Sequence, residues 1–274
     1  MSRKVLMNIS ITIPTQNSGK TLSSCLSSIF SQPVDNIEVI VVDGHSSDNT
    51  LDIANEFGCD VLFYSGSLLG KRCLGIDRCR GEFILLMDSD QVLAPRVLSR
   101  TADLLLKYDM LVLEEKSLRT DTAIQKLYSL DRILVHQVRD FSPFSSALLP
   151  RIFRANVLRR AILSIPQSLL AKVCAQDHAI LYFESWKVSN KVGYVESALY
   201  HNEPTDLGTV FRKNLRYGRC DKILARSGYY DDLTKARTRI RKGITSVRDP
   251  RLIVGTLLLQ TLKGVAYGCG YVTG

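Results

Sequence analysis

The stretch IEVIVVDGHSSDNTLDIANEFG (residues 37–58) decides the fold class. Its first six residues are mostly β-branched and apolar, which predicts a strand buried on both faces. Ser, Asp and Asn follow, which favour the start of a helix, and Gly58 marks its end. A strand, a polar loop and a helix in this order indicate a sheet whose strands are joined by crossover helices.

The same alternation extends over the first 115 residues. Further strands are predicted at 8–13, 59–64, 82–88 and 109–115, and further helices at 19–32, 70–79 and 95–108. This pattern predicts an α/β fold with a mostly parallel sheet and helices on both faces. Residues 116–200 mix helical patterns with short strands. A change in charge after residue 205 predicts a first domain at 1–205 and a helical extension at 206–274.

The positive charge is concentrated in one segment. Residues 211–251 hold 13 Lys and Arg but four Asp, which equals the net charge of +9 of the whole chain. Such a segment predicts an anionic partner: a phosphate, a nucleic acid or a membrane surface. A solvated basic helix face is the alternative. Nucleic acid is disfavoured because no aromatic residues alternate with the basic ones to form a stacking platform.

The cysteines and the N-terminus indicate a cytosolic protein. The seven cysteines are odd in number, irregularly spaced and without a CxxC pair, which predicts reduced thiols. The sequence MSRKVLMNIS lacks the apolar run of a signal peptide. No stretch reaches the roughly 18 uninterrupted apolar residues of a membrane-spanning helix.

Polar residues follow three of the predicted strands, at 14–17 (PTQN), 43–48 (DGHSSD) and 88–90 (DSD). In a parallel sheet, ligands bind beyond the carboxyl ends of the strands. Asp88 and Asp90 stand one residue apart at the end of a buried strand, where their charges repel. A divalent cation would relieve that repulsion, because hard carboxylate oxygens are its preferred ligands. The alternative is a turn or a helix cap before APRVL.

Four blocks of the chain resemble family 2 glycosyltransferases: ISITIPTQN, IEVIVVDGHSSDNT, GKRCLGIDRCRGEFILLMDSD and AQDHAILYF. Their order and spacing are typical of that family over roughly residues 1–200. The resemblance implies a GT-A fold, a UDP- or GDP-sugar donor, a Mg²⁺ or Mn²⁺ ion and inversion at the anomeric carbon. The GT-A fold needs no GxGxxG motif, and none is present in this sequence.

The resemblance also implies roles for residues at the three strand ends. Asp90 would bind the metal directly, and Asp88 would contact the ribose or reach the metal through water. Asp43, followed by Gly44, would accept a hydrogen bond from the base, although an Asx-turn is compatible with the same position. Arg72 would reach the nucleotide, or belong to an exposed helix start. The other expected donor-binding residues are Pro14, Thr15, Gln16, Asn17 and Ser89.

Three residues further along the chain complete the implied site. Asp177, in AQDHAILYF, would be the general base that takes the proton of the acceptor hydroxyl, and it also suits the N-cap of a helix at 178–187. His201 would complete the metal site, or serve the structure. Arg216, in KNLRYG, would neutralise the leaving diphosphate, or belong to a basic helix face.

The C-terminal segment 251–274 contains LIVGTLLLQTL, which is too short to span a bilayer and too apolar to lie bare in water. Together with the basic segment it predicts peripheral binding at the cytoplasmic face of the membrane, near a lipid-linked or glycan acceptor. A helix packed on the domain or in a dimer is the alternative. Two other protein classes remain: a nucleotidyltransferase, and a nucleotide-sugar-binding protein that does not need Asp177.

Overall fold

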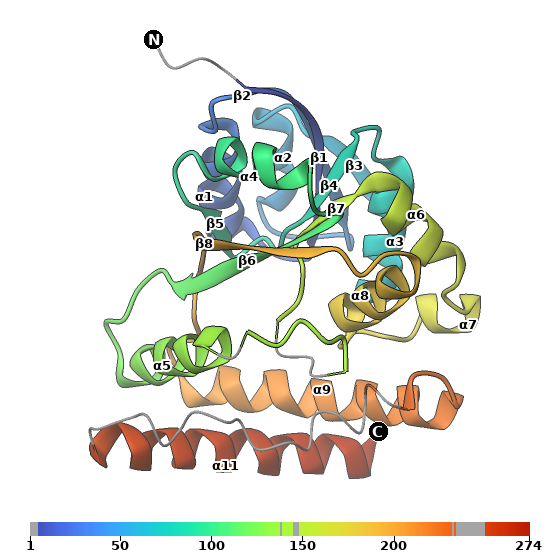
Figure 1. The fold of residues 1–274 in the computed structure, drawn as a ribbon. Helices are drawn as coiled ribbons and strands as arrows, with labels where there is room; N and C mark the ends of the chain where they lie inside the picture. Colours follow the sequence, from blue (N-terminus) through green and yellow to red (C-terminus); the bar gives the residue numbers. More distant parts are fainter. Residues whose placement is uncertain (1–4, 138, 145–147, 232, 234–249) are drawn as a thin grey trace.

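An eight-stranded sheet runs through the molecule with helices on both of its faces (Figure 1). The computed structural model describes residues 5–137, 139–144, 148–231, 233 and 250–274. The strands are β1 (Val5–Thr15), β2 (Val34–Asp43), β3 (Asp60–Phe63), β4 (Phe83–Leu86), β5 (Gln91–Leu93), β6 (Met110–Ser117), β7 (Ile152–Arg154) and β8 (Val192–His201). They lie side by side in the order β3-β2-β1-β4-β7-β6-β8-β5.

The helices follow the predicted alternation in the first half of the chain. They are α1 (Gly19–Phe30), α2 (Thr50–Glu56), α3 (Leu68–Arg78), α4 (Val97–Leu105), α5 (Ala123–Gln137), α6 (Ala155–Leu163), α7 (Gln167–Leu170), α8 (Asp177–Val188), α9 (Leu207–Ser227) and α11 (Pro250–Thr273). Helices α1, α2 and α3 connect parallel strands, as the pattern of the sequence predicts. The predicted domain boundary near residue 205 falls just before α9.

The sheet is mixed rather than mostly parallel. Among the described residues, β1–β2, β1–β4, β2–β3 and β6–β8 pair in parallel, whereas β4–β7, β6–β7 and β5–β8 are antiparallel. The expected parallel arrangement therefore holds for the first four strands. The antiparallel pairs arise because β7 inserts between β4 and β6, and because β8 carries β5 on its outer side.

The apolar run of β4 is buried on both sides of the sheet. Leu85 packs into a cluster with residues of α1, α2 and α4, whereas Ile84 and Leu86 pack into a second cluster with residues of α3, α6 and α8. Successive strand residues point to opposite faces, so a strand covered on both faces must be apolar throughout. The core therefore has two layers, and polar residues can only follow at the strand ends.

Helices α9 and α11 form a separate layer below α5 and α8 in Figure 1, with α11 outermost. Two glycines let these helices approach closely. A Cβ at Gly218 would lie 2.0 Å from the Tyr267 carbonyl oxygen, and one at Gly270 would lie 2.0 Å from the Leu215 carbonyl oxygen. The apolar C-terminal segment is thus part of one 24-residue helix. Within the described ranges, no helix combines the length and apolarity needed to cross a bilayer.

Candidate active site

The ends of β1 and β2 form one hydrogen-bonded corner. Thr15 and Asp43 are partners in the parallel register, and the Thr15 hydroxyl donates to Asp43 Oδ2 over 2.7 Å. The Ser46 amide donates to Asp43 Oδ1 over 2.7 Å, and the Gly44 amide donates to the Thr15 carbonyl over 2.9 Å. Burial raises the pKa of the Asp43 carboxyl, but hydrogen bonds from Ser46 and Thr15 outweigh burial and lower this pKa. Asp43 is therefore an ionised acceptor held in one orientation.

The loop after β1 is tied to the loop after β2. Asn17 adopts a left-handed conformation with φ 52°, and its Oδ1 accepts a hydrogen bond from the Ser47 amide over 2.9 Å. Pro14 is buried within the sheet, whereas Gln16 and Asn17 are exposed. Of the residues predicted to cradle the base and ribose, Gln16 and Asn17 are thus accessible to a ligand, and Pro14 shapes the end of the strand.

Ser89, between the two acids of DSD, connects the third strand end to the first two. Its hydroxyl donates to Ser18 Oγ over 2.9 Å. The Ser18 amide in turn donates to the Thr50 hydroxyl over 2.8 Å, at the start of α2. The three polar strand ends predicted from the sequence therefore lie next to one another.

Lys71 and Arg72 point from α3 into this region. Lys71 Nζ donates to the Thr15 carbonyl over 2.8 Å, and a Cβ on Gly44 would lie 2.2 Å from that nitrogen. Gly44 therefore leaves the space that the ammonium group occupies. Lys71 is 5% exposed and Arg72 is 1% exposed, so the alternative of an exposed helix start is wrong.

Arg72 joins the DSD segment to the first turn of α8. Its Nη2 forms an ion pair with Asp88, and its Nε pairs with Asp177 Oδ2. Arg151, just before β7, lies 3.1 Å from the other oxygen of Asp88. Burial raises the pKa of the Asp88 carboxyl, but the charges of Arg72 and Arg151 outweigh burial and hold this pKa well below its ordinary value. Two arginines therefore balance the charge of Asp88.

Asp90 and His201 meet where β5 pairs with β8. Gln91 and His201 are cross-strand partners, and the Asn202 amide donates to the Asp90 carbonyl over 2.9 Å. Asp90 Oδ2 lies 3.5 Å from His201 Nε2, while His201 Nδ1 lies 3.6 Å from Glu203 Oε2. A histidine backed by a carboxylate on its second nitrogen is the usual arrangement of a metal ligand.

The donor set fits a divalent cation with two protein ligands. A carboxylate oxygen and an imidazole nitrogen suit Mn²⁺, and the carboxylate alone suits Mg²⁺. Over the residues that the structure describes, no three His, Cys, Asp or Glu side chains converge into a metal site. The predicted trio is therefore not assembled here, because Asp88 faces Arg72 and Arg151 instead of Asp90 and His201. Phosphate oxygens and water would have to complete the coordination.

Sequence reasoning missed the ionic network behind Asp88. Arg151 contacts Glu115 Oε1 over 2.6 Å, and Arg132 pairs with both Glu115 and Glu203. Burial raises the pKa values of Glu115 and Glu203. The charges of Arg151 and Arg132 outweigh burial at Glu115, and the neighbouring His201 and Arg132 outweigh it at Glu203, so each pKa falls to about 2. The network thus reaches from Asp88 to the carboxylate behind His201.

Asp177 is the first residue of α8 rather than its N-cap. Gln176 occupies the N-cap position in a left-handed conformation with φ 64°. The Asp177 carboxylate is mostly buried and is paired with Arg72. The ion pair with Arg72 therefore fixes the orientation of the Asp177 carboxylate at the start of α8.

The KNLRYG motif lies on α9, and its two cations have different surroundings. Arg216, the predicted diphosphate ligand, is exposed, with its guanidinium carbon 5.8 Å from the centre of the Tyr217 ring. Lys213 is close enough to Tyr217 and to Asp90 for both to raise the pKa of its ammonium group, although burial opposes them. Lys213, which sequence reasoning did not select, therefore interacts electrostatically with Asp90 of the DSD loop.

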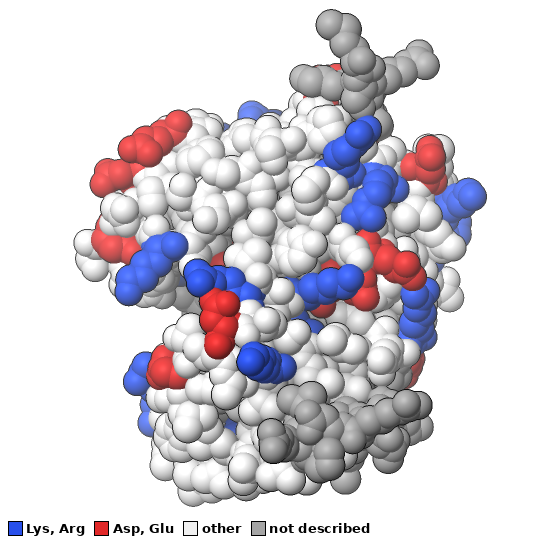
Figure 2. All heavy atoms as spheres, turned by 90° about the vertical axis from the view of Figure 1, so that its left-hand side faces the viewer, with Lys and Arg blue, Asp and Glu red and all other residues white. Residues whose placement is uncertain are grey.

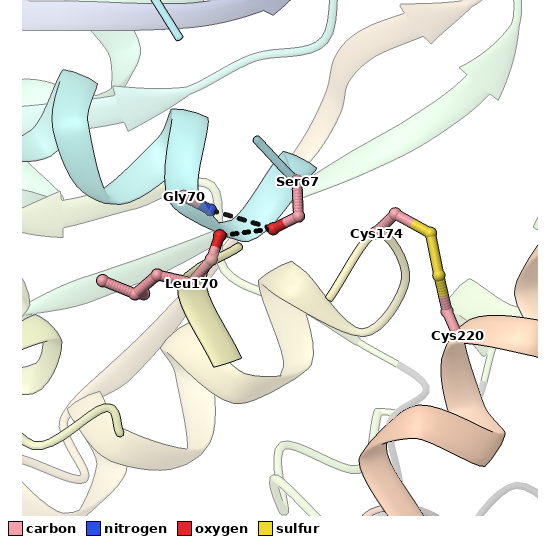
Figure 3. Close-up of a disulfide and its surroundings, with 5 residues drawn as sticks. All are labelled: Ser67, Gly70, Leu170, Cys174 and Cys220. Atoms are coloured by element: carbon pink, nitrogen blue, oxygen red, sulfur yellow. Dashed lines mark hydrogen bonds between the residues drawn. A yellow bond between two sulfur atoms is a disulfide. The ribbon is translucent and has the colours of Figure 1, made fainter. Parts of the chain in front are cut away.

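The loop before α8 is joined to α9 by a disulfide between Cys174 and Cys220 (Figure 3). The expectation that all thiols are reduced is therefore wrong for this pair, which the spacing of cysteines in the sequence could not identify. Close to the bridge, Ser67 caps α3 by accepting a hydrogen bond from the Gly70 amide, and its hydroxyl donates to the Leu170 carbonyl over 2.7 Å. These contacts fix the helix that carries Lys71 and Arg72.

Comparison with known proteins confirms the resemblance drawn from the sequence. Residues 10–114 match the family described as glycosyl transferase family 2. The putative glycosyltransferase EpsH of Bacillus subtilis is 27% identical over 213 residues, which cover 70% of this chain and 60% of EpsH. The poly(ribitol-phosphate) beta-N-acetylglucosaminyltransferase TarS of Staphylococcus aureus is 23% identical over 72% of this chain and 35% of its own. The chain thus spans less than two thirds of either relative.

Solved structures confirm the GT-A fold. Residues 1–349 of S. aureus TarS, in complex with UDP-GlcNAc, superpose with a TM-score of 0.58 at 17% identity, covering 95% of this chain and 82% of that one. The mannosyltransferase PcManGT from Pyrobaculum calidifontis, in complex with GDP-Man and Mn²⁺, superposes with a TM-score of 0.56 at 14% identity, covering 96% of this chain and 76% of that one. At these identities the likeness concerns the fold.

Proposed function

We propose that this chain, with its family 2 glycosyltransferase region at residues 10–114, is an inverting glycosyltransferase that uses a UDP- or GDP-sugar. The observation that carries the proposal is the single ion-paired group in which Arg72 contacts both Asp88 of the DSD segment and Asp177 of α8. One cation thereby links the predicted donor site to the predicted base. Nucleotide-sugar complexes of structures with the same fold support the donor class.

The donor would lie across the ends of β1, β2 and β4. Asp43 offers an ionised acceptor to the N–H edge of uracil or guanine, and Gln16 and Asn17 are exposed beside it. Lys71 lies in the same corner and adds a positive charge close to the nucleotide. This arrangement suits a nucleoside diphosphate, whose base needs hydrogen bonds and whose phosphates need cations.

Asp90 and His201 are the residues that would hold a Mg²⁺ or Mn²⁺ ion. Glu203 would orient the imidazole of His201 from behind. A bound divalent ion supplies charge neutralisation to the departing diphosphate. Lys213 adds a second positive charge near the same loop. Asp88 has a different role in this proposal, which is to hold Arg72 and Arg151 in place.

Asp177 would act as the general base of a single displacement. The acceptor oxygen attacks the anomeric carbon, the bond from that carbon to the diphosphate breaks, and the hydroxyl proton passes to a carboxylate oxygen of Asp177. Arg72 pairs with Asp177 and thereby fixes the position of its carboxylate next to the predicted donor site.

The acceptor would be a glycan or a lipid-linked glycan at a membrane surface. On α11, Val254, Leu258, Val265 and Val272 recur at helical spacing and are each more than half exposed. On α9, which packs against α11, Arg212, Arg216, Arg219 and Arg226 recur on one exposed face. An apolar stripe on one helix and a basic stripe on the helix packed against it suit the interface of an anionic membrane.

The surface at the lower end of the molecule is consistent with membrane binding through α9 and α11. In Figure 2, charged side chains of both signs gather across the middle of the face shown, while the white surface along its lower edge, at the height of α11 in Figure 1, carries few of them. The basic residues between positions 235 and 248, which belong to the segment predicted to bind an anionic partner, lie outside the described residues. We propose that the enzyme binds peripherally at a membrane surface through α9 and α11.

The catalytic proposal is tested by comparing two variants with the wild-type chain in the presence of Mn²⁺ and a series of UDP- and GDP-sugars. Asp177→Asn should bind the donor, measured by calorimetry, but lose roughly 10²-fold or more in turnover. Asp90→Ala should lose the part of donor affinity that depends on Mn²⁺. Asp60→Asn, an acid outside the site, is the matched control. Full transfer by Asp177→Asn would show that another group is the base.

The membrane proposal is tested by flotation with vesicles that contain about one third anionic lipid. The full chain should float, and a Val254→Asp/Leu258→Asp variant should stay at the bottom because charge cannot enter the interface cheaply. Leu163→Asp, which changes an exposed leucine of α6, is the matched control and should float. Equal flotation of all three proteins contradicts the proposal. A dimer that dissociates in the double variant would assign the apolar stripe to self-association instead.

A further inference from the structure

The loop that leads into Asp177 is held by α9. Gln176, directly before Asp177, is 6% exposed, and its side-chain Nε2 donates to Asp221 Oδ2 over 3.3 Å. Asp221 lies on α9 and is 1% exposed. The neighbouring Cys220 forms the disulfide with Cys174. Two adjacent residues of α9 therefore contact the same short loop.

Helix α11 reaches this loop through Asp221. The Tyr267 hydroxyl of α11 donates to Asp221 Oδ2 over 2.9 Å, which is the oxygen that also accepts from Gln176. Gly218 has no Cβ, and one added there would collide with the Tyr267 carbonyl; this close packing brings Tyr267 within reach of Asp221. A continuous path of hydrogen bonds thus runs from α11 through α9 to the residue before the proposed base.

The backbone at Gln176 explains why such support is needed. Its φ of 64° lies in the left-handed region, which L-residues with a side chain seldom adopt. Such conformations persist only where the surrounding contacts determine them, and they cluster at functional sites. Because Asp177 follows directly, the direction of its carboxylate toward Arg72 depends on this backbone.

We propose that Asp221 is a positioning residue for Asp177, and that Tyr267 couples α11 to the proposed base through it. This inference rests on the proposed role of Asp177. It means that the C-terminal helices contribute to the chemical step as well as to surface binding. The disulfide between Cys174 and Cys220 holds the same loop covalently, so the two restraints act together.

The experiment compares Tyr267→Phe and Asp221→Asn with the wild-type chain in steady-state transfer assays. Tyr267→Phe removes one hydroxyl, and Tyr271→Phe is the matched control because Tyr271 stacks on Tyr267 and is exposed at the end of α11. We expect kcat to fall about tenfold or more in Tyr267→Phe and Asp221→Asn while KM for the donor stays unchanged, since small displacements of a catalytic group slow chemistry. Tyr271→Phe should match wild type.

Two outcomes would overturn the inference. One is an unchanged kcat in both Tyr267→Phe and Asp221→Asn. The other is a parallel loss of donor affinity and melting temperature, which indicates a structural role only. If either variant does not fold, Cys174→Ser in the wild-type background gives a second test, because releasing the same loop from α9 should also lower kcat while KM for the donor stays unchanged. Asp177→Asn separates the two proposals: if it retains full transfer, the proposed base itself is wrong.

Discussion

Replacing Glu115 by glutamine tests whether the ionic network behind Asp88 holds the molecule together. Glu115 Oε1 lies 2.6 Å from Arg151 Nη2 and 3.0 Å from Arg151 Nε, and its other oxygen pairs with Arg132. The side chain is 12% exposed. Glu115→Gln leaves two guanidinium groups facing a neutral amide in a buried setting. Removing one partner of a buried ion pair typically costs about 3–5 kcal/mol.

The expected loss is large enough to be read in a thermal or urea unfolding experiment. For a chain of this size each kcal/mol lowers Tm by roughly 2–4 °C, so Glu115→Gln should melt roughly 6–20 °C below wild type. Glu196→Gln is the matched control, because Glu196 pairs with Arg139 while both side chains are more than half exposed. Exposed pairs contribute about 0–1 kcal/mol, so this control should melt within a few degrees of wild type.

The pH dependence of unfolding provides a second test of the role of Glu115. The pKa of Glu115 is lowered from 4.5 to about 2, because the charges of Arg151 and Arg132 outweigh the effect of burial. A lowered pKa contributes stability that is fully present above the unfolded value and is lost as the pH falls through the folded value. The difference in stability between wild type and Glu115→Gln should therefore shrink between about pH 5 and pH 2. A difference below about 1 kcal/mol at pH 7, or one that does not shrink in acid, refutes the reasoning.

Three further variants test other contacts by simple measurements. Gly218→Ala places a Cβ 2.0 Å from the Tyr267 carbonyl oxygen and should loosen the packing of α9 against α11. In the control Gly264→Ala, the added Cβ meets no atom within 4 Å. Limited proteolysis should therefore cut Gly218→Ala faster than Gly264→Ala. Leu85→Ala leaves a cavity under a buried strand and should lower the unfolding free energy by about 2–5 kcal/mol in urea titrations. Asp43→Asn should weaken binding of UDP or GDP by about tenfold or more in calorimetry, because the carboxylate acceptor is lost, and equal affinity would move the base-binding site elsewhere.

The sequence predicts the first half of the fold well, because its signals are local. Each strand from β1 to β4 is a short apolar run followed by a polar loop, so both the element and its ligand-facing end are visible in the residues themselves. The three strand ends at Thr15, Asp43 and Ser89 lie together as expected. The sheet is less parallel than predicted because β7 and β8 come from the region where the patterns overlap.

The candidate site was harder to predict where it depends on contacts between distant residues. Arg151 comes 63 positions after Asp88, and nothing in its surroundings marks it as the partner of that carboxylate. Strand β5 has three residues, too few for a period to be recognised. The pairing of Cys174 with Cys220 follows from tertiary structure alone. Lys213 and Arg216 share one motif, and only the packing of α9 decides which of them lies near Asp90.

The place of β8 in the sheet has a consequence for the order of events during synthesis. Among the described residues, β8 is the last strand along the sequence, yet it lies between β6 and β5, and β5 pairs with β8 alone. A ribosome releases Asp90 long before His201. The first strands and their helices make contacts between segments that are close in the sequence, and such contacts form quickly. Pairings between segments that are distant in the sequence form late. The nascent chain therefore gains its nucleotide-facing corner early and its Asp90–His201 pair only after nearly three quarters of the residues have emerged.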